Sequence, residues 1–94
     1  MIFESFAIQT ISHLPVRKKT FATYHSALRL HIFPTLAHRD IREISRLDIQ
    51  RVIQGLPPQI AATSLAVVKT VFREALAQEL IQDSPAHGVS GPKI

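Results

Sequence analysis

Apolar residues recur three and four positions apart in four stretches of this 94-residue chain, and none of these stretches alternates apolar with polar residues as a β-strand does. We therefore expect four helices, over about 2–13, 18–33, 45–55 and 60–81, with a loop over 34–44. Two boundaries carry clear signals, because Ser45 and Asp48 form a capping-box pattern and Pro34 cannot continue a helix. The length suits one compact domain, so the chain is predicted to be all-α.

The second expected helix carries a basic surface, and no acidic residue occurs from Ser5 to Arg39. At the helical period one side is mainly apolar and contains Phe21, Tyr24, Leu28, His31 and Ile32. The other side is basic, hydroxylated or small and contains Lys19, Ala22, Thr23, Ser26 and Arg29. Such a surface can approach a polyanion closely and form hydrogen bonds with phosphate oxygens. This helix is therefore predicted to face nucleic acid.

The fourth expected helix offers a second surface of this kind, within an acid-free window over 49–73. Its main stripe is predicted to contain Leu65, Val68, Phe72, Ala75, Leu76 and Glu79, with Leu80 beside it. Next to the stripe lie Ala62, Ala66, Lys69, Thr70 and Arg73, and Thr63 and Ser64 stand near the helix N-terminus, where a phosphate is favoured. Two such helices could straddle one groove of a duplex. The alternative is that Lys69 and Arg73 form only a solvated face.

Composition and motifs restrict the other function classes. A net charge of +4 and a pI near 10.1 favour an anionic partner. Without cysteine the chain has no disulfide or thiolate metal site, and its five histidines form no pair at the spacing of a helical metal site. No glycine-rich phosphate loop or nucleophile elbow occurs. We expect no catalytic residue, metal or cofactor, and the lack of a signal peptide or a bilayer-length apolar run predicts a cytoplasmic protein with no membrane contact.

A longer series of residues adds a family resemblance. Thr20, Tyr24, Leu28, Arg29, His31, Ile32, Pro34 and Leu36 follow the pattern T-x3-Y-x3-L-R-x-H-I-x-P-x-L. In order after them come Ile41, Ile44, Ser45, Asp48, Ile49, Gln50, Ile53, Thr63, Val68, Phe72, Ala75, Leu80, Ile81, Ser84, Pro85, Ala86, Pro92 and Lys93. The series covers nearly the whole chain. It resembles the core-binding, SAM-like N-terminal domain of the tyrosine recombinases, the phage-integrase family.

The resemblance implies a compact four- to five-helix SAM-like bundle with orthogonal helix packing, which holds one face of double-stranded DNA while a separate catalytic domain closes on the other. Carried over by position, the DNA-binding residues would be Lys18, Lys19, Thr20, Thr23, Ser26, Arg29, Thr63, Lys69, Thr70 and Arg73. Most would contact phosphates, and Arg29, Lys69 and Arg73 are the candidates for base edges. The implied function is to position duplex DNA for recombination and DNA integration, in the cytoplasm of a bacterium or from a phage or mobile element, at the nucleoid when bound.

The resemblance also implies what the chain lacks. The family's catalytic arginines, His-x-x-Arg motif and nucleophilic tyrosine belong to the C-terminal domain, and Tyr24 is predicted to pack in the bundle. We expect a DNA-binding domain over 1–88 and the start of a linker over 89–94, with the catalytic domain and other recombinase protomers as further partners. Two positions depart from the family pattern, since Ala37 replaces a usual glycine and Ser84 a usual asparagine.

Two other interpretations remain open at this point. The first is a helical SAM-like protein-interaction module, for which exposed side chains of Val67, Val71, Leu30 and Phe33 would form a docking surface. The second is a stand-alone helix-turn-helix regulator, which the long loop over 34–44 disfavours.

Overall fold

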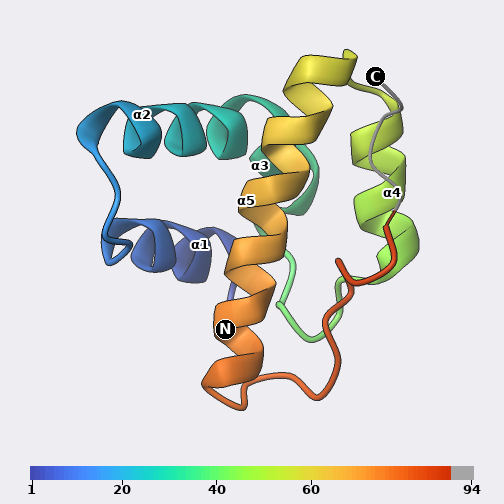
Figure 1. The fold of residues 1–94 in the computed structure, drawn as a ribbon. Coiled ribbons are helices and arrows are strands. Elements are labelled where there is room, and N and C mark those ends of the chain that lie inside the picture. The colour runs from blue at the N-terminus through green and yellow to red at the C-terminus, as the bar shows by residue number, and fades with distance from the viewer. Residues whose placement is uncertain (90–94) are drawn as a thin grey trace.

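The computed structural model describes residues 1–89, and within them the chain is built from helices without a β-strand. The elements are α1 (Phe3–Ser12), α2 (Lys18–Ala27), a π-helical turn η1 (Leu28–Ile32), α3 (Phe33–Leu36), α4 (Arg46–Gln54) and α5 (Pro58–Ala77). In Figure 1, α1 and α2 run across the long α5, whereas α4 lies on its other side. The predicted small all-α bundle is confirmed.

Helix α5 contributes the largest part of the core. Its buried residues are Ala61, Ser64, Leu65, Val67, Val68, Val71, Phe72 and Ala75. The ring of Phe72 lies 5.6 Å from that of Phe3, measured between centroids, and Phe3 in turn meets Phe33 edge-on at 6.1 Å. Because α1, α2, η1 and α4 all contact α5, its buried face is wider than one stripe.

This wide face corrects the predicted docking surface of a protein-interaction module. Val67 and Val71 are fully buried, and Phe33 packs partly buried against the core, so none of the three forms an exposed patch. Only Leu30 of that set is well exposed, at 59% of its surface.

Pro34 does not end the helical segment, because a wider π-helical turn precedes it. The α-helical pattern stops at Ala27, but the chain continues through η1 into α3, which carries Pro34 in its first turn. The N–H of Phe33 donates to the carbonyl of Leu28, five residues back. In a regular α-helix the proline ring would clash with the carbonyl of Leu30, and a wider turn avoids this clash. The predicted loop over 34–44 is therefore helical at its start.

The two later helices begin and end at identifiable signals. The Ser45 hydroxyl accepts the N–H of Asp48 at 3.2 Å and the Asp48 carboxylate accepts the N–H of Ser45 at 3.0 Å, which confirms the capping box. Helix α5 begins earlier than predicted, at Pro58, because proline suits a first helical position. It ends earlier as well, at Ala77, and Glu79 has a φ of 60° in the turn that follows. The prediction that Glu79 belongs to the helical stripe was wrong.

The end of the predicted linker lies outside the described residues. Val89 is buried against the core, and its N–H donates to the carbonyl of Ala86 at 3.3 Å. Residues 90–94, which include Pro92 and Lys93 of the family pattern, are not described. The boundary between a domain over 1–88 and a linker stays a prediction.

The buried hydroxyl of Ser64 generates a stability prediction. Its oxygen has no hydrogen-bond partner among residues 1–89. We expect Ser64→Ala to raise the free energy of unfolding by about 1 kcal/mol, because it removes an unsatisfied buried group and improves helix propensity. Urea unfolding followed by circular dichroism measures the change. The exposed Ser26→Ala is the matched control, with a change within about 0.5 kcal/mol. A loss of stability in Ser64→Ala would show that its hydroxyl does have a partner.

Candidate nucleic-acid interface

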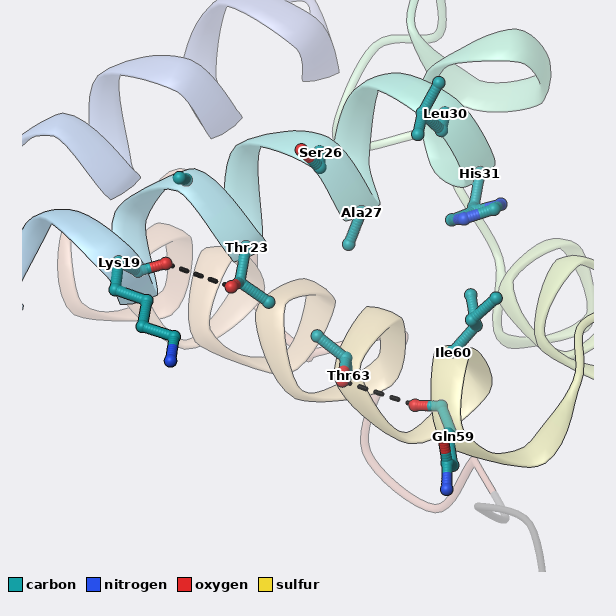
Figure 2. Close-up of a pocket in the computed structure, with 10 residues that line it drawn as sticks. Lys19, Thr23, Ser26, Ala27, Leu30, His31, Gln59, Ile60 and Thr63 are labelled. Atoms are coloured by element: carbon teal, nitrogen blue, oxygen red, sulfur yellow. Dashed lines mark hydrogen bonds between the residues drawn. The ribbon is translucent and has the colours of Figure 1, made fainter.

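A groove runs between α2 and the N-terminal half of α5, the two helices that carry the predicted basic surfaces (Figure 2). One part of it, of about 510 Å³, is lined from α2 and η1 by Lys19, Ala22, Thr23, Ser26, Ala27, Leu30 and His31, and from α5 by Gln59, Ile60 and Thr63. The adjoining part is lined by Lys19, Thr20, Thr23, Tyr24, Ala62, Thr63 and Ala66. Because Lys19, Thr23 and Thr63 belong to both parts, we treat them as one α2–α5 groove.

The predicted binding residues divide between this groove and two other places. Those that line the groove are Lys19, Thr20, Thr23, Ser26 and Thr63. Lys18 and Arg29 are exposed on the same helical path but lie outside the groove. Lys69 and Arg73 line a separate second hollow, of about 250 Å³, together with Leu76, Ser84, His87 and Gly88. Thr70 lies on α5 between the two.

The outward side of α5 connects the groove to the second hollow. Thr63, Ala66, Thr70 and Arg73 follow one another at helical spacing on this side. From Thr63 to Arg73 the helix rises by about 15 Å at its regular pitch. The two predicted surfaces therefore form one elongated strip, with α2 beside one end of it.

The hydroxyl groups of the three outward threonines are already engaged. Thr23 donates to the carbonyl of Lys19 at 2.9 Å, Thr63 to that of Gln59 at 3.3 Å, and Thr70 to that of Ala66 at 3.0 Å. In Figure 2 the methyl groups of Thr23 and Thr63 point toward each other across the groove. A hydroxyl whose hydrogen is used can only accept a hydrogen bond. Thr23, Thr63 and Thr70 therefore do not offer a donor to phosphate in this arrangement.

Thr20 and Ser26 differ from these three threonines. Within residues 1–89 no hydrogen bond engages either of their hydroxyl groups. Both side chains line the groove, so both can donate to an anionic ligand.

Several lining residues were missed by the sequence analysis. Gln59 lies one turn before Thr63, but the helix was expected to begin only at Ile60. His31 was assigned to the packed side, yet it is half-buried and lines the groove from η1. At the second hollow, His87 is a further lining residue that the sequence did not single out. The Arg46 guanidinium also approaches this hollow, since its Nη1 lies 3.4 Å from the position that a Cβ on Gly88 would take.

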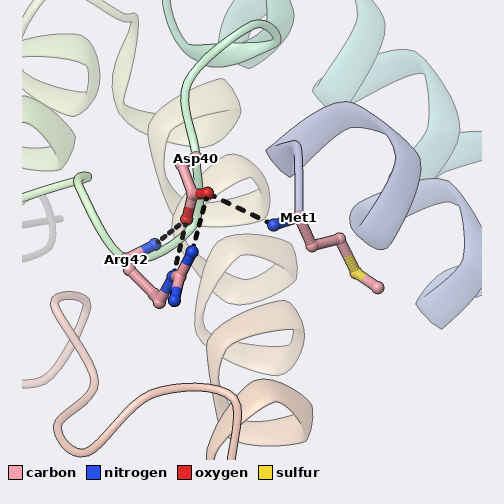
Figure 3. A network of polar contacts seen from close by, with 3 residues as sticks. All are labelled: Met1, Asp40 and Arg42. Carbon is pink, nitrogen blue, oxygen red and sulfur yellow. Dashed lines mark hydrogen bonds and ion pairs between the residues drawn. The ribbon is translucent and has the colours of Figure 1, made fainter.

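Acidic residues and their ion pairs lie away from the groove. Asp40 binds the Arg42 guanidinium at 3.3 Å and the N-terminal ammonium of Met1 at 3.2 Å (Figure 3), and Asp48 lies 3.5 Å from Arg39. These hydrogen bonds influence the acids themselves. The Arg42 side chain and backbone N–H hold the pKa of Asp40 well below its usual range, and the N–H of Ser45 lowers the pKa of Asp48.

The five cations of the predicted interface take no part in these pairs. Within residues 1–89 no ion pair engages Lys18, Lys19, Arg29, Lys69 or Arg73. Neither the groove nor the second hollow is lined by an aspartate or glutamate. The strip is consequently a site of uncompensated positive charge, which is the condition for attracting a polyanion.

The described part of the chain contains neither a metal-binding cluster nor a helix that could span a membrane. Across residues 1–89 no group of three or more histidine, aspartate or glutamate residues could hold a metal ion. None of the helices formed by these residues has the length and hydropathy that crossing a bilayer requires.

Comparison with known proteins gives the family. A family model described as "Phage integrase, N-terminal SAM-like domain" matches residues 3–56, which is more than half of the chain. The chain belongs to this family. The match on this integrase SAM-like domain includes α1 to α4, so it contains α2 but not α5.

A solved structure resembles the whole integrase SAM-like domain, including α5. It is the solution NMR structure of a fragment, 61–160, of a protein from Clostridium leptum. It shares 26% sequence identity and a TM-score of 0.83, over 99% of this chain and 90% of that one. No curated protein matches the chain.

The carboxylates of this domain generate a pH prediction. A carboxyl group with a lowered folded pKa adds stability that is present above its unfolded pKa, near 3.8, and is lost as the pH falls through the folded value. Asp48→Asn removes one such group while keeping a side-chain oxygen for the Ser45 N–H. We expect this variant to lose less stability than the parent between pH 6 and pH 2.5, as measured by urea unfolding midpoints at each pH. Parallel curves would contradict a role of Asp48 in the acid response.

Proposed function

We propose that this integrase SAM-like domain binds double-stranded DNA with the α2–α5 groove and the outward side of α5, as the core-binding domain of a site-specific tyrosine recombinase. The observation that carries the proposal is the strip itself. It brings together two helices that are separated in sequence, and its five cations have no acidic partner within the described residues. Surfaces of this kind match the regularly spaced charges of a duplex.

The dimensions and side chains of the strip suit the major groove. Its length along α5, about 15 Å, is comparable with the width of the B-DNA major groove, about 12 Å. Ala22, Ala62 and Ala66 line the α2–α5 groove and add little bulk, so the backbones can approach the DNA closely. Cations at both ends of the strip would then lie near phosphates on either side.

The proposed roles follow from the hydrogen bonding of each residue. Lys18, Lys19, Arg29, Lys69 and Arg73 contribute charge, and Arg29, Lys69 and Arg73 are the candidates for contacts with base edges. Thr20 and Ser26 donate to phosphate oxygens. Thr23, Thr63 and Thr70 accept hydrogen bonds, because their own hydrogens are bound to the helix backbone. An acceptor suits a base amino group rather than a phosphate.

In this proposal the domain positions DNA and the recombination chemistry takes place elsewhere. Strand exchange and DNA integration would be carried out by a catalytic domain of the full-length recombinase, and other protomers would bind neighbouring sites. Binding by the isolated domain would be weak and dominated by charge.

Salt dependence tests the proposal directly. Five cations that each neutralise a phosphate predict that the logarithm of the association constant falls with the logarithm of the salt concentration with a slope of about −4.5. Each cation that contacts a base edge instead makes this slope shallower by about 0.9. Fluorescence anisotropy of a labelled duplex, titrated at several sodium chloride concentrations, measures this slope. A flat response, or an absence of binding at low salt, would overturn the proposal.

Charge-matched double variants localise the interface. We expect Lys69→Ala with Arg73→Ala to weaken DNA binding and to reduce the steepness of the salt slope, by about 2 where both residues neutralise phosphates. Arg42→Ala with Arg51→Ala removes the same charge from exposed positions outside the strip and should change both quantities little. Circular dichroism checks that both variants fold. Equal effects from the two pairs would show that the strip is not the interface.

A further inference from the structure

One end of the α2–α5 groove exposes apolar side chains. Leu30 is 59% exposed and Ile60 is 37% exposed, although both line a hollow that also contains Lys19. In Figure 2 Leu30, His31 and Ile60 gather at one end of the hollow, whereas Lys19 lies at the other. Large exposed apolar side chains at one end of this groove are not explained by attraction to phosphates, so they point to an apolar feature on the partner.

Two threonines whose hydroxyl groups donate to the helix backbone add methyl groups to this apolar surface. The methyl groups of Thr23 and Thr63 face the groove, and their hydroxyl oxygens are limited to accepting hydrogen bonds. The surface beside Lys19 therefore combines methyl groups with hydrogen-bond acceptors.

One base pair presents the matching chemistry in the major groove. The C5 methyl of thymine is the apolar feature of that groove, and the N6 amino group of the paired adenine is a hydrogen-bond donor on the same edge, with the O4 acceptor of thymine between them. A G·C pair has no such methyl group. Resting on the DNA-binding function proposed above, we infer that Leu30 and Ile60 contact thymine methyl groups, while Thr23 and Thr63 accept hydrogen bonds from adenine amino groups. Leu30 and Ile60 are then specificity-determining residues for A·T base pairs.

The charge of the hollow suits the DNA of the proposed function as its occupant. No acidic residue lines the hollow, and Lys19 stands within it, so an anionic partner with a recessed apolar group is complementary to it. In a duplex the phosphates lie at the rim of the major groove and the methyl groups lie deeper within it. Lys19 at one end of the hollow, with Leu30 and Ile60 at the other, offers a charge for a phosphate and an apolar surface for a methyl group.

The test uses two 20-base-pair duplexes of alternating A·T sequence, one of which contains deoxyuridine in place of thymidine. The two differ only in the C5 methyl groups. We expect the parent protein to bind the thymidine duplex about fourfold more tightly for each methyl group that becomes buried. Anisotropy competition at fixed salt measures the ratio of the two dissociation constants.

Variants connect the ratio to the two side chains. The double variant Leu30→Ala with Ile60→Ala should bring the ratio close to one. Leu30→Ala alone should bring the ratio part of the way to one. Leu47→Ala is the matched control, since Leu47 is a similarly exposed leucine, at 56%, on α4 and outside the groove. It should leave the ratio at the parent value.

The outcomes separate this inference from the proposed function. Equal affinities of the parent for both duplexes, with the salt slope intact, would overturn the thymine inference alone. Failure to bind either duplex would overturn the DNA-binding function itself. If the ratio keeps the parent value in both variants, these side chains do not contact thymine and the inference is overturned. If Leu30→Ala loses self-association, measured by sedimentation without DNA, Leu30 belongs to a protein contact, and the inference is overturned as well.

Discussion

Burial of one wide face of α5 holds the other helices of the domain in position. Ser64, Val67 and Val71 extend the buried surface beyond the stripe that contains Leu65, Val68, Phe72 and Ala75, which allows α1, α2, η1 and α4 to pack on the same helix. With so much of its circumference occupied, α5 leaves only one side to solvent. The cations and threonines of α5 lie on that side because it is the part not needed for packing. The packing of α5 therefore determines both the core of the domain and the side of the helix that the proposed interface uses.

The π-helical turn determines what stands at the far end of the groove. Since Pro34 prevents a regular α-helical turn before it, the chain widens at η1, the turn that carries Leu30 and His31. Both side chains line the groove, although the sequence pattern placed His31 on the packed side. An irregular backbone turn therefore stands at this end of the groove.

Much of the fold was predictable because local signals and packing agreed. The capping box of Ser45 and the apolar periodicity of the helices were confirmed, since both act over one or two turns. The exposure of Val67 was wrongly predicted because its burial depends on helices that are distant in sequence. The same limit applies to the site. The basic faces were visible in the sequence, but the groove between α2 and α5, the contribution of Gln59 and the engaged hydroxyl of Thr23 depend on tertiary structure and hydrogen-bond geometry.

The separation of acids from the basic strip has a consequence for how the domain meets its partner. Acidic residues lie in α1, in the segment over 39–48 and from Glu74 onward, whereas α2 carries only positive charge. Within residues 1–89 the cations of α2 are unpaired, so this helix carries net positive charge on one side of the domain. A polyanion attracts that side more strongly than the others, so the domain would rotate during its approach. A larger share of encounters would then begin with the groove already turned toward the duplex.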